Sequence, residues 1–415
     1  MEIVESKNTL APFSELAKSY SQINEVNASS LIKKLGDFRF PTRRDEYWKY
    51  TPTRAVEKTN WQFSSDLPEE LNLPASLGNG PRLVFINGNY SEKFSSQEGL
   101  PKLSSAEGSS VDELSSPFNP LADLNQLLPQ KTYKLHLMKN EVVDQVVSIV
   151  HIFQGENIIS QPYMEVVLEE GASLKLNEYH VHRGSSTFSN SFSRYQVGRN
   201  AELGLDLIQE GKGESFLHNQ TIVNQDKDSR FTQNTFTLSG NWVRNNTIVN
   251  INGQNSEANL NGIYIPSEKE HVDNHTIIDH KVAHCESNEL YRGVMMDKST
   301  GVFNGKVFVR QDAQKTNAFQ SNGNVLLSDF ATINSKPELE IYADDVKCSH
   351  GSTTGQMDDE ALFYLMSRGI SERNSRILLV NAFAEDVLAE MVNDNLRGYV
   401  EKAIKEKLSG VSNGE

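Results

Sequence analysis

The spacing of apolar residues changes twice along this chain and predicts three structural regions. Residues 9–40 carry two apolar stripes at helical spacing, and Pro41 ends the second one. The same spacing returns after residue 358, where Gly369 is expected to stop one helix and Ser371 to cap the next. We therefore expect helices near both ends of the chain.

Between these ends, apolar and polar residues alternate as they do in short β-strands. Similar short motifs begin at positions 172, 201, 230, 258, 287 and 316, so the pattern recurs at nearly even intervals. A helix-free repeat of this length predicts a stacked array, most simply a parallel β-helix. The alternative is a β-sandwich whose turns are evenly spaced.

The N-terminal third contains two segments of unusual composition. Residues 42–52 combine alternating charges with three aromatic side chains, which suits a docking helix capped by Thr42. The segment 91–118 is rich in Ser and poor in apolar positions, so it is expected to form a surface excursion or linker. We expect three domains, namely a helical domain with the Ser-rich excursion over residues 1–130, a parallel β-helix core over 131–350 and a helical domain over 351–415.

Composition narrows the functions open to the chain. Hydrophobic residues make up 37% of the 415 residues, a low share that an elongated array tolerates better than a compact globule. The net charge of −15 disfavours non-specific nucleic-acid binding, which needs clustered Lys and Arg. The N-terminal segment does not resemble a signal peptide, no apolar run has membrane-spanning length, and there are only two Cys. These features favour a reducing cytoplasm.

Common catalytic motifs are missing from the sequence. Residues 301–306 have the wrong glycine spacing for a Walker loop and lack the Ser or Thr that would contact magnesium. There is no Gly-x-Ser-x-Gly turn and no His-Glu-x-x-His pair. We therefore expect a protein that is not an enzyme, and any nucleotide hydrolysis would belong to a partner.

Cys348 and His350 form the most informative candidate site. In an extended strand, residues i and i+2 point to the same face, so a thiolate and an imidazole would lie side by side. Such a pair suits iron, zinc or copper(I). The alternative is a Cys that packs as a small apolar residue beside a hydrogen-bonded His.

A second group of possible ligands follows in the strand-rich region. Equal gaps would place His271 with His275, and His280 with His284, on common faces, and Cys285 comes next. His and Cys are good ligands for zinc and iron. The alternative is a polar ladder in which neighbouring strands satisfy each side chain.

Four motifs resemble the SufB/SufD family in sequence, order and spacing. They are RDEYWKYTP at residues 44–52, HKVAHCESNELYRG at 280–293, YADDVKCSHG at 342–351 and LMSRGI at 365–370. The resemblance covers most of the chain from about residue 40 to about residue 400. It implies a mainly β fold, with a central right-handed parallel β-helix between N-terminal and C-terminal helical domains.

The resemblance also implies a function, that of a scaffold subunit of the SUF iron–sulfur cluster assembly complex. Such a subunit pairs with a SufB-like paralogue through the β-helix and binds a SufC-like ABC ATPase through its C-terminal helices. His350 matches the family's interface histidine, with Cys348 beside it. We expect no tightly bound cofactor in the isolated chain and a transient iron ion or iron–sulfur cluster in the complex. Flavin has been associated with such complexes, although this chain has no dinucleotide fingerprint.

Further expectations concern single residues and other partners. The apolar residues expected to contact the ATPase are Leu365, Met366, Leu378 and Phe383. The weaker metal candidates are His280, His284 and Cys285. An isolated chain could pair with a second copy as a homodimer. Two other functions stay open, a cytoplasmic metal-binding β-helix protein and a β-helix carbohydrate-active enzyme.

Overall fold

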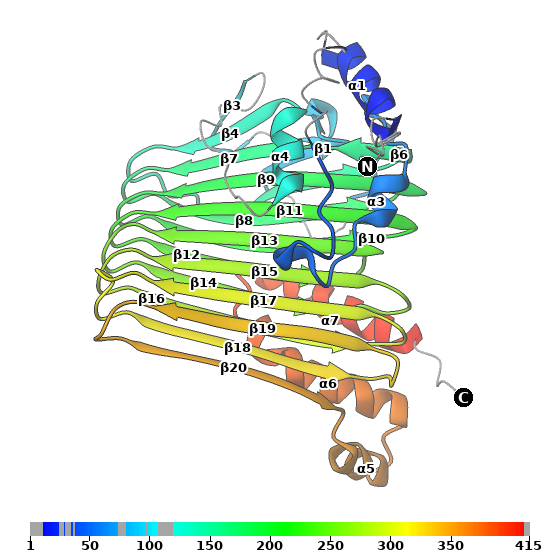
Figure 1. The fold of residues 1–415 in the computed structure, drawn as a ribbon, viewed down its shortest axis with the longest axis vertical. Coiled ribbons are helices and arrows are strands. Elements are labelled where there is room, and N and C mark those ends of the chain that lie inside the picture. Colours follow the sequence, from blue (N-terminus) through cyan, green and yellow to red (C-terminus); the bar gives the residue numbers. More distant parts are fainter. Residues whose placement is uncertain are drawn as a thin grey trace, which may run out of the picture.

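Two β-sheets of ten strands each form the centre of the molecule (Figure 1). The structure is a computed structural model that describes residues 11–24, 29, 35, 38–73, 80–96, 98–106 and 119–410. The first sheet has the order β2 (Asn89–Tyr90), β1 (Arg82–Ile86), β5 (Val147–Phe153), β8 (Ser173–His182), β10 (Glu202–Gly211), β12 (Arg230–Thr237), β14 (Glu257–Tyr264), β16 (Glu286–Met295), β18 (Asn317–Leu326) and β20 (Lys347–Gln356). The second has the order β19 (Thr332–Ile341), β17 (Thr300–Val309), β15 (His271–His280), β13 (Trp242–Ile251), β11 (Glu214–Gln225), β9 (Ser186–Val197), β7 (Tyr163–Leu168), β4 (Thr132–Leu137) and β3 (Lys102–Ala106), with β6 (Glu156–Ser160) beside β9.

The chain winds through these sheets as a solenoid. From β7 to β20, successive strands alternate between the two sheets. Among the described strands, only the pairs β1–β2 and β3–β4 are antiparallel, and the other pairs are parallel. The predicted parallel β-helix is therefore confirmed, and the β-sandwich alternative, which would have antiparallel sheets, is wrong.

The predicted repeat is also confirmed, although its turns are uneven. One column of paired residues in the first sheet consists of Ser173, Glu202, Arg230, Glu257, Glu286, Asn317 and Lys347. The shortest step in this column runs from Arg230 to Glu257, and the longest runs from Glu286 to Asn317. The nearly even intervals seen in the sequence lie between these extremes. The positions predicted from the sequence therefore differ slightly from the true register wherever a turn is longer or shorter.

The interior between the sheets holds a continuous apolar cluster. It runs from Leu83 in β1 to Ala343 before β20 and includes Cys285, and the partly buried Cys348 packs against it. Because side chains alternate across a strand, every second residue points into this interior. The outward residues of both sheets are covered by helices over much of their length, so each sheet buries two faces.

The C-terminal helices α6 (Glu372–Leu388) and α7 (Asp394–Gly410) cover the outer face of the first sheet. Lys407 near the end of α7 places its Nζ 2.6 Å from Glu270 Oε2, which ties this helix to the solenoid. The shorter helix α5 (Asp359–Ser367) lies beyond β20, past the end of the stack (Figure 1). Two predicted signals are confirmed here, because Gly369 follows α5 with φ +85° and the Ser371 hydroxyl accepts the Asn374 N–H.

The helices α3 (Arg54–Lys58) and α4 (Pro120–Leu127) lie on the outer face of the second sheet, and α1 (Ala11–Asn24) lies at the N-terminal end of the stack, where it packs on the same apolar cluster (Figure 1). Trp61 packs there against Phe188 and Phe216, with ring centroids 5.6 and 5.8 Å away. The first predicted N-terminal helix is thus confirmed, whereas the second lies largely outside the described residues. No helix in the described part of the chain is long and apolar enough to span a membrane.

The docking helix predicted for residues 42–52 is wrong. Only η1 (Glu46–Trp48) is helical, as one 3-10 turn whose N-cap is Asp45. Thr42 does not cap a helix but donates its backbone N–H to the Asp45 carboxylate at 2.7 Å. Pro52 disfavours helical backbone at the residue before it, which limits how far a helix could extend.

The Ser-rich segment contains regular structure in its first half. Its described residues form η3 (Glu92–Phe94) and β3, and β3 pairs antiparallel with β4. The linker interpretation is therefore wrong for this part, because the strand adds an edge to the second sheet. Residues 107–118 lie outside the described residues.

Candidate functional site at the end of the solenoid

Cys348 and His350 lie on β20, the last strand of the first sheet. They pair in register with Ala318 and Gln320 of β18, which are both buried in the interior. Register partners in a parallel sheet point to the same face, so both candidate ligands point inward, as their spacing predicted. No described strand pairs with the far edge of β20, so Cys348 is half-buried and His350 is exposed.

A buried polar column leads inward from His350. Gln320 follows it in the register, and Glu289 of β16 follows Gln320. The Gln320 amide donates a hydrogen bond to the Glu289 carboxyl. Burial raises the pKa of Glu289 to about 7 despite that hydrogen bond. His350 is therefore the exposed end of a column whose buried member changes charge near neutral pH.

Hydroxyl groups link the two sheets at the same end. The Ser335 hydroxyl of β19 donates to Asn322 Oδ1 at 2.9 Å and lies 2.8 Å from the Ser352 hydroxyl of β20. These contacts hold the last strands of the two sheets together. Burial raises the pKa of the Cys348 thiol, so it is protonated at neutral pH unless a metal displaces the proton.

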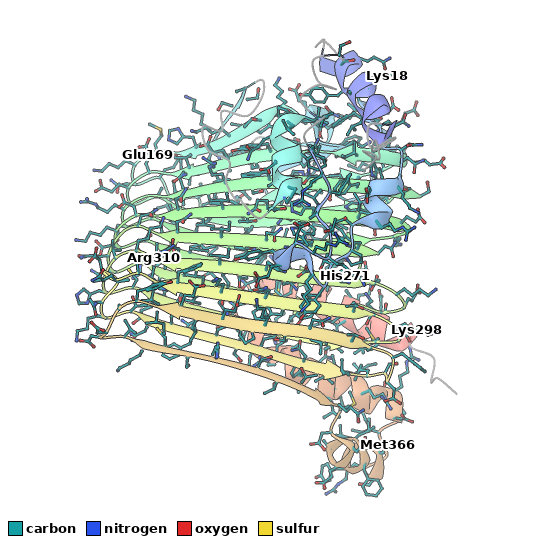
Figure 2. All side chains as sticks on the ribbon, viewed as in Figure 1. Lys18, Glu169, His271, Lys298, Arg310 and Met366 are labelled. Carbon is teal, nitrogen blue, oxygen red and sulfur yellow. The ribbon has the colours of Figure 1, made fainter. Side chains whose placement is uncertain are left out.

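The group of four His and Cys285 is divided between different faces. His271 and His275 lie on the outer face of β15, as predicted, and Figure 2 shows His271 where the N-terminal segment crosses this sheet. His280 points into the interior, where its Nε2 lies 2.8 Å from the Ser287 hydroxyl. The shared face predicted for His280 and His284 is wrong, because β15 ends at His280 and His284 lies in a turn with φ +61°.

Cys285 does not belong to a cluster of possible metal ligands within the described residues. It is fully buried, its thiol lies 3.4 Å from the carbonyl oxygens of Gly253 and Ala283, and burial raises its pKa. Within the described chain, none of these weaker candidates belongs to a group of three or more close metal donors.

His271 and His275 flank a buried ion pair on the outer face. Asp273 between them lies 2.6 Å from Arg244 through Oδ2, and the Thr51 hydroxyl donates to the same oxygen. His271 Nε2 lies 3.0 Å from that hydroxyl, and His275 Nε2 lies 3.0 Å from Asp273 Oδ1. The alternative of a satisfied polar ladder therefore describes these two His side chains.

The C-terminal helices expose a group of large apolar side chains beyond the end of the stack. Phe363, Tyr364 and Met366 of α5 are 74%, 57% and 42% exposed, and Leu378 of α6 is 49% exposed. Figure 2 shows Met366 on the helix past β20. Leu365 is half-buried. Three of the four residues predicted for the ATPase contact thus lie on or beside this surface.

Phe383 differs from the other three. It packs against the solenoid, and its ring lies 5.5 Å from the Arg292 guanidinium. Its neighbours Val380, Ala384 and Val387 are buried against the first sheet. The face of α6 that carries Phe383 is therefore the one that packs on the solenoid.

Sequence reasoning missed the polar residues inside the solenoid. Glu289 and Gln320 are almost fully buried, and so are Glu178 and His180 of β8. A signal for the second pair was present, because Glu178, His180 and His182 occupy alternate positions of one strand and so share a face.

The chain was compared with known protein families and curated proteins. Residues 151–383 match the family model described as SUF system FeS cluster assembly, SufBD core domain. The chain belongs to the SufBD family. It is 31% identical to the iron–sulfur cluster assembly protein SufD of Escherichia coli, over 98% of each chain. It is 28% identical to a SufBD family protein of Synechocystis, over 93% of each chain. It is 27% identical to a SufBD family protein of Mycobacterium bovis, over 89% of this chain and 90% of the relative.

Membership of the SufBD family confirms the resemblance drawn from the four sequence motifs. It assigns the chain to SUF iron–sulfur cluster assembly, and the likeness to SufD extends over nearly the whole chain. The region matched by the family model runs from β5 into α6 and includes Cys348 and His350. The comparisons give no support for the flavin.

Proposed function

We propose that this chain is a scaffold subunit that pairs with a SufB-like paralogue through the C-terminal end of its solenoid. His350 would contribute to the interface at which iron is acquired and a nascent cluster forms, with Cys348 as the weaker ligand. The observation that supports this most is that a His and a Cys side chain, both of types that can bind iron, point inward from β20, the last strand of the first sheet.

The open end of the solenoid favours a protein partner. Both β19 and β20 are terminal strands in their sheets, and they leave backbone groups without a sheet partner on one edge. Exposed edges of this kind pair readily with other strands. Ile341 at the end of β19 is 42% exposed, so a partner would also bury apolar surface there. The same end would serve a homodimer when no paralogue is present.

Ligand chemistry favours His350 over Cys348 as the first contact for iron. A neutral imidazole binds metal without losing a proton, whereas a protonated thiol must release one. Burial raises the pKa of Cys348 and makes this release more costly. Iron and the cluster are cargo at this end of the solenoid in this proposal, and their assembly there calls for no catalytic residue of the chain's own.

The exposed apolar surface on the C-terminal helices is proposed to bind a SufC-like ATPase. Leu378, Met366 and Leu365 were expected there, and Phe363 extends the surface. An exposed cluster of large apolar side chains on a short terminal helix marks a protein contact. ATP hydrolysis would belong to that partner, within an assembly in the cytoplasm. In the proposed division into residues 1–130, 131–350 and 351–415, the second region pairs with the paralogue and the third binds the ATPase.

Co-expression with the two partners tests both contacts separately. Ile341→Asp places a charge at the end of the solenoid, and Phe363→Asp places one on α5; both positions are exposed, so the fold should persist. We expect the first variant to lose the paralogue but keep the ATPase, and the second to show the reverse. Met138→Asp, at a 52% exposed position near the other end of the solenoid, is the matched control. Unchanged co-purification of both partners by both variants would refute the proposed contacts.

A further inference from the structure

A separate set of metal donors lies inside the solenoid, several strands away from β20. His151 on β5 pairs in register with His180 on β8, and Glu178 precedes His180 by two positions on the same face. One donor atom from each of the three side chains lies within 4.8 Å of the others. No other group of three such residues occurs in the described part of the chain.

The three side chains are enclosed. His151, Glu178 and His180 are 2%, 3% and 0% exposed. Glu178 Oε1 lies 2.7 Å from His180 Nε2 and 3.8 Å from His151 Nε2. The Tyr195 hydroxyl donates to the other carboxylate oxygen at 2.8 Å, which fixes the orientation of the carboxylate. The Nδ1 atoms of both His side chains are buried without a hydrogen-bond partner.

The charges around this set favour a cation. Glu178 is almost fully buried, and among the described residues only the imidazoles of His151 and His180 lie within ion-pair distance of its carboxylate. A buried carboxylate among such groups is stabilised by a bound positive ion.

Aromatic rings close the site and hold the imidazoles in place. Phe85 stacks on His151 with centroids 5.0 Å apart, and Phe153 meets His180 edge-on at 5.9 Å. His182 is held separately, with its ring nitrogens 2.7 Å from the Thr187 hydroxyl and 3.1 Å from the Ser189 hydroxyl. His182 is therefore a neighbour of the donor set and not a member of it.

We propose that His151, Glu178 and His180 bind one divalent transition-metal ion inside the first rungs of the solenoid. Two imidazole nitrogens and one carboxylate oxygen suit Zn²⁺ or Fe²⁺, whereas Mg²⁺ and Ca²⁺ prefer oxygen ligands alone. Three protein donors leave a fourth position for water. The enclosed position indicates a retained ion that ties β5 to β8, and not an ion in transit. The inference stands independently of the role proposed for His350.

Metal analysis of the full-length chain tests the site. Because the donors are enclosed, the metal is supplied during expression, with zinc or with cobalt as the spectroscopic probe. We expect about one ion per chain in the natural protein and in His350→Ala, and a tetrahedral cobalt spectrum in both. Glu178→Gln and His180→Gln should lower metal retention against a chelator about tenfold or more. His182→Gln is the matched control and should retain the ion.

A second measurement does not depend on variants that fold poorly. X-ray absorption at the zinc edge of the natural protein should show only nitrogen and oxygen ligands, with two imidazoles. The proposal is overturned if the chain retains no metal, if sulfur appears among the ligands, or if His350→Ala alone removes the ion. Equal retention by folded Glu178→Gln and the natural protein would overturn it too.

Discussion

His350 pairs in register with Gln320, and the Gln320 amide donates a hydrogen bond to the buried carboxyl of Glu289. The exposed end of the solenoid is therefore connected by one side chain to a group buried two strands deep. Polar groups of this kind are costly in an apolar interior unless they are paired. Because Gln320 and Glu289 are polar and buried behind His350, apolar packing alone does not account for the residues of the last turns.

Replacing Glu289 by Gln should change how stability depends on pH. The usual pKa of Glu is 4.5, and burial raises it to about 7 in the folded chain. Folding therefore takes up a proton between these values, so stability falls as pH rises from about 4.5 to about 7, by up to about 1.4 kcal/mol per pH unit. Glu289→Gln should remove this slope in urea unfolding measured across that range.

The matched control for this prediction is Glu286→Gln on the same strand, because Glu286 is exposed. It should keep the pH dependence of the natural protein. Parallel pH profiles for Glu289→Gln and the natural protein would show that Glu289 is ionised in the fold, contrary to the raised pKa.

Trp48→Ala should destabilise the attachment of the N-terminal segment to the second sheet. The Trp48 ring lies over Arg244, with the guanidinium carbon 3.8 Å from the ring centroid, and is stacked near Trp242 at 6.5 Å. Trp48 is 1% exposed, and removing a buried Trp typically costs about 3 to 5 kcal/mol. Urea unfolding should report a loss of this order, whereas Tyr50→Ala, at a 40% exposed position, should have little effect. Similar stabilities for the two variants would contradict the packing described for Trp48.

Phe363→Ala and Phe383→Ala should affect different properties of the chain, the first ATPase binding and the second stability. Phe363 is 74% exposed, so its loss should weaken binding to the ATPase without changing the melting temperature. Phe383 packs beside Arg292 on the solenoid, so its loss should lower the melting temperature. Calorimetric titration with the ATPase and thermal unfolding distinguish the two. Equal losses of ATPase binding with unchanged melting temperatures would instead place Phe383 in the contact.

The repeat and the terminal helices could be predicted because their signals are local. Caps such as Ser371 and stops such as Gly369 act on their own helix, and alternation of apolar residues reports strands directly. The period of the repeat was found without structure, because each turn buries the same interior face. Uneven turns shifted the register slightly but did not change the architecture.

The predictions of local structure were wrong where contacts with residues far away in sequence, or a turn, determine the backbone. Residues 42–52 read as a helix, but Trp48 and Thr51 are held by Arg244 and Asp273, which are far away in sequence. His280 and His284 have helical or strand spacing, but a turn begins between them. The apolar pattern of α6 also does not tell which side chains pack on the solenoid, as Phe383 does, and which are exposed, as Leu378 is. The ATPase contact predicted for both residues stays a prediction.

The most direct test of the account is cluster formation by a complex that carries His350→Ala. Iron, sulfide and visible absorbance are measured after anaerobic assembly with the paralogue and the ATPase, and the mass of the complex is measured in parallel. We predict an intact complex without a cluster for His350→Ala, most of the cluster for Cys348→Ala, and a full cluster for Gln356→Ala at the exposed end of the same strand. A full cluster in an intact His350→Ala complex would contradict the central claim.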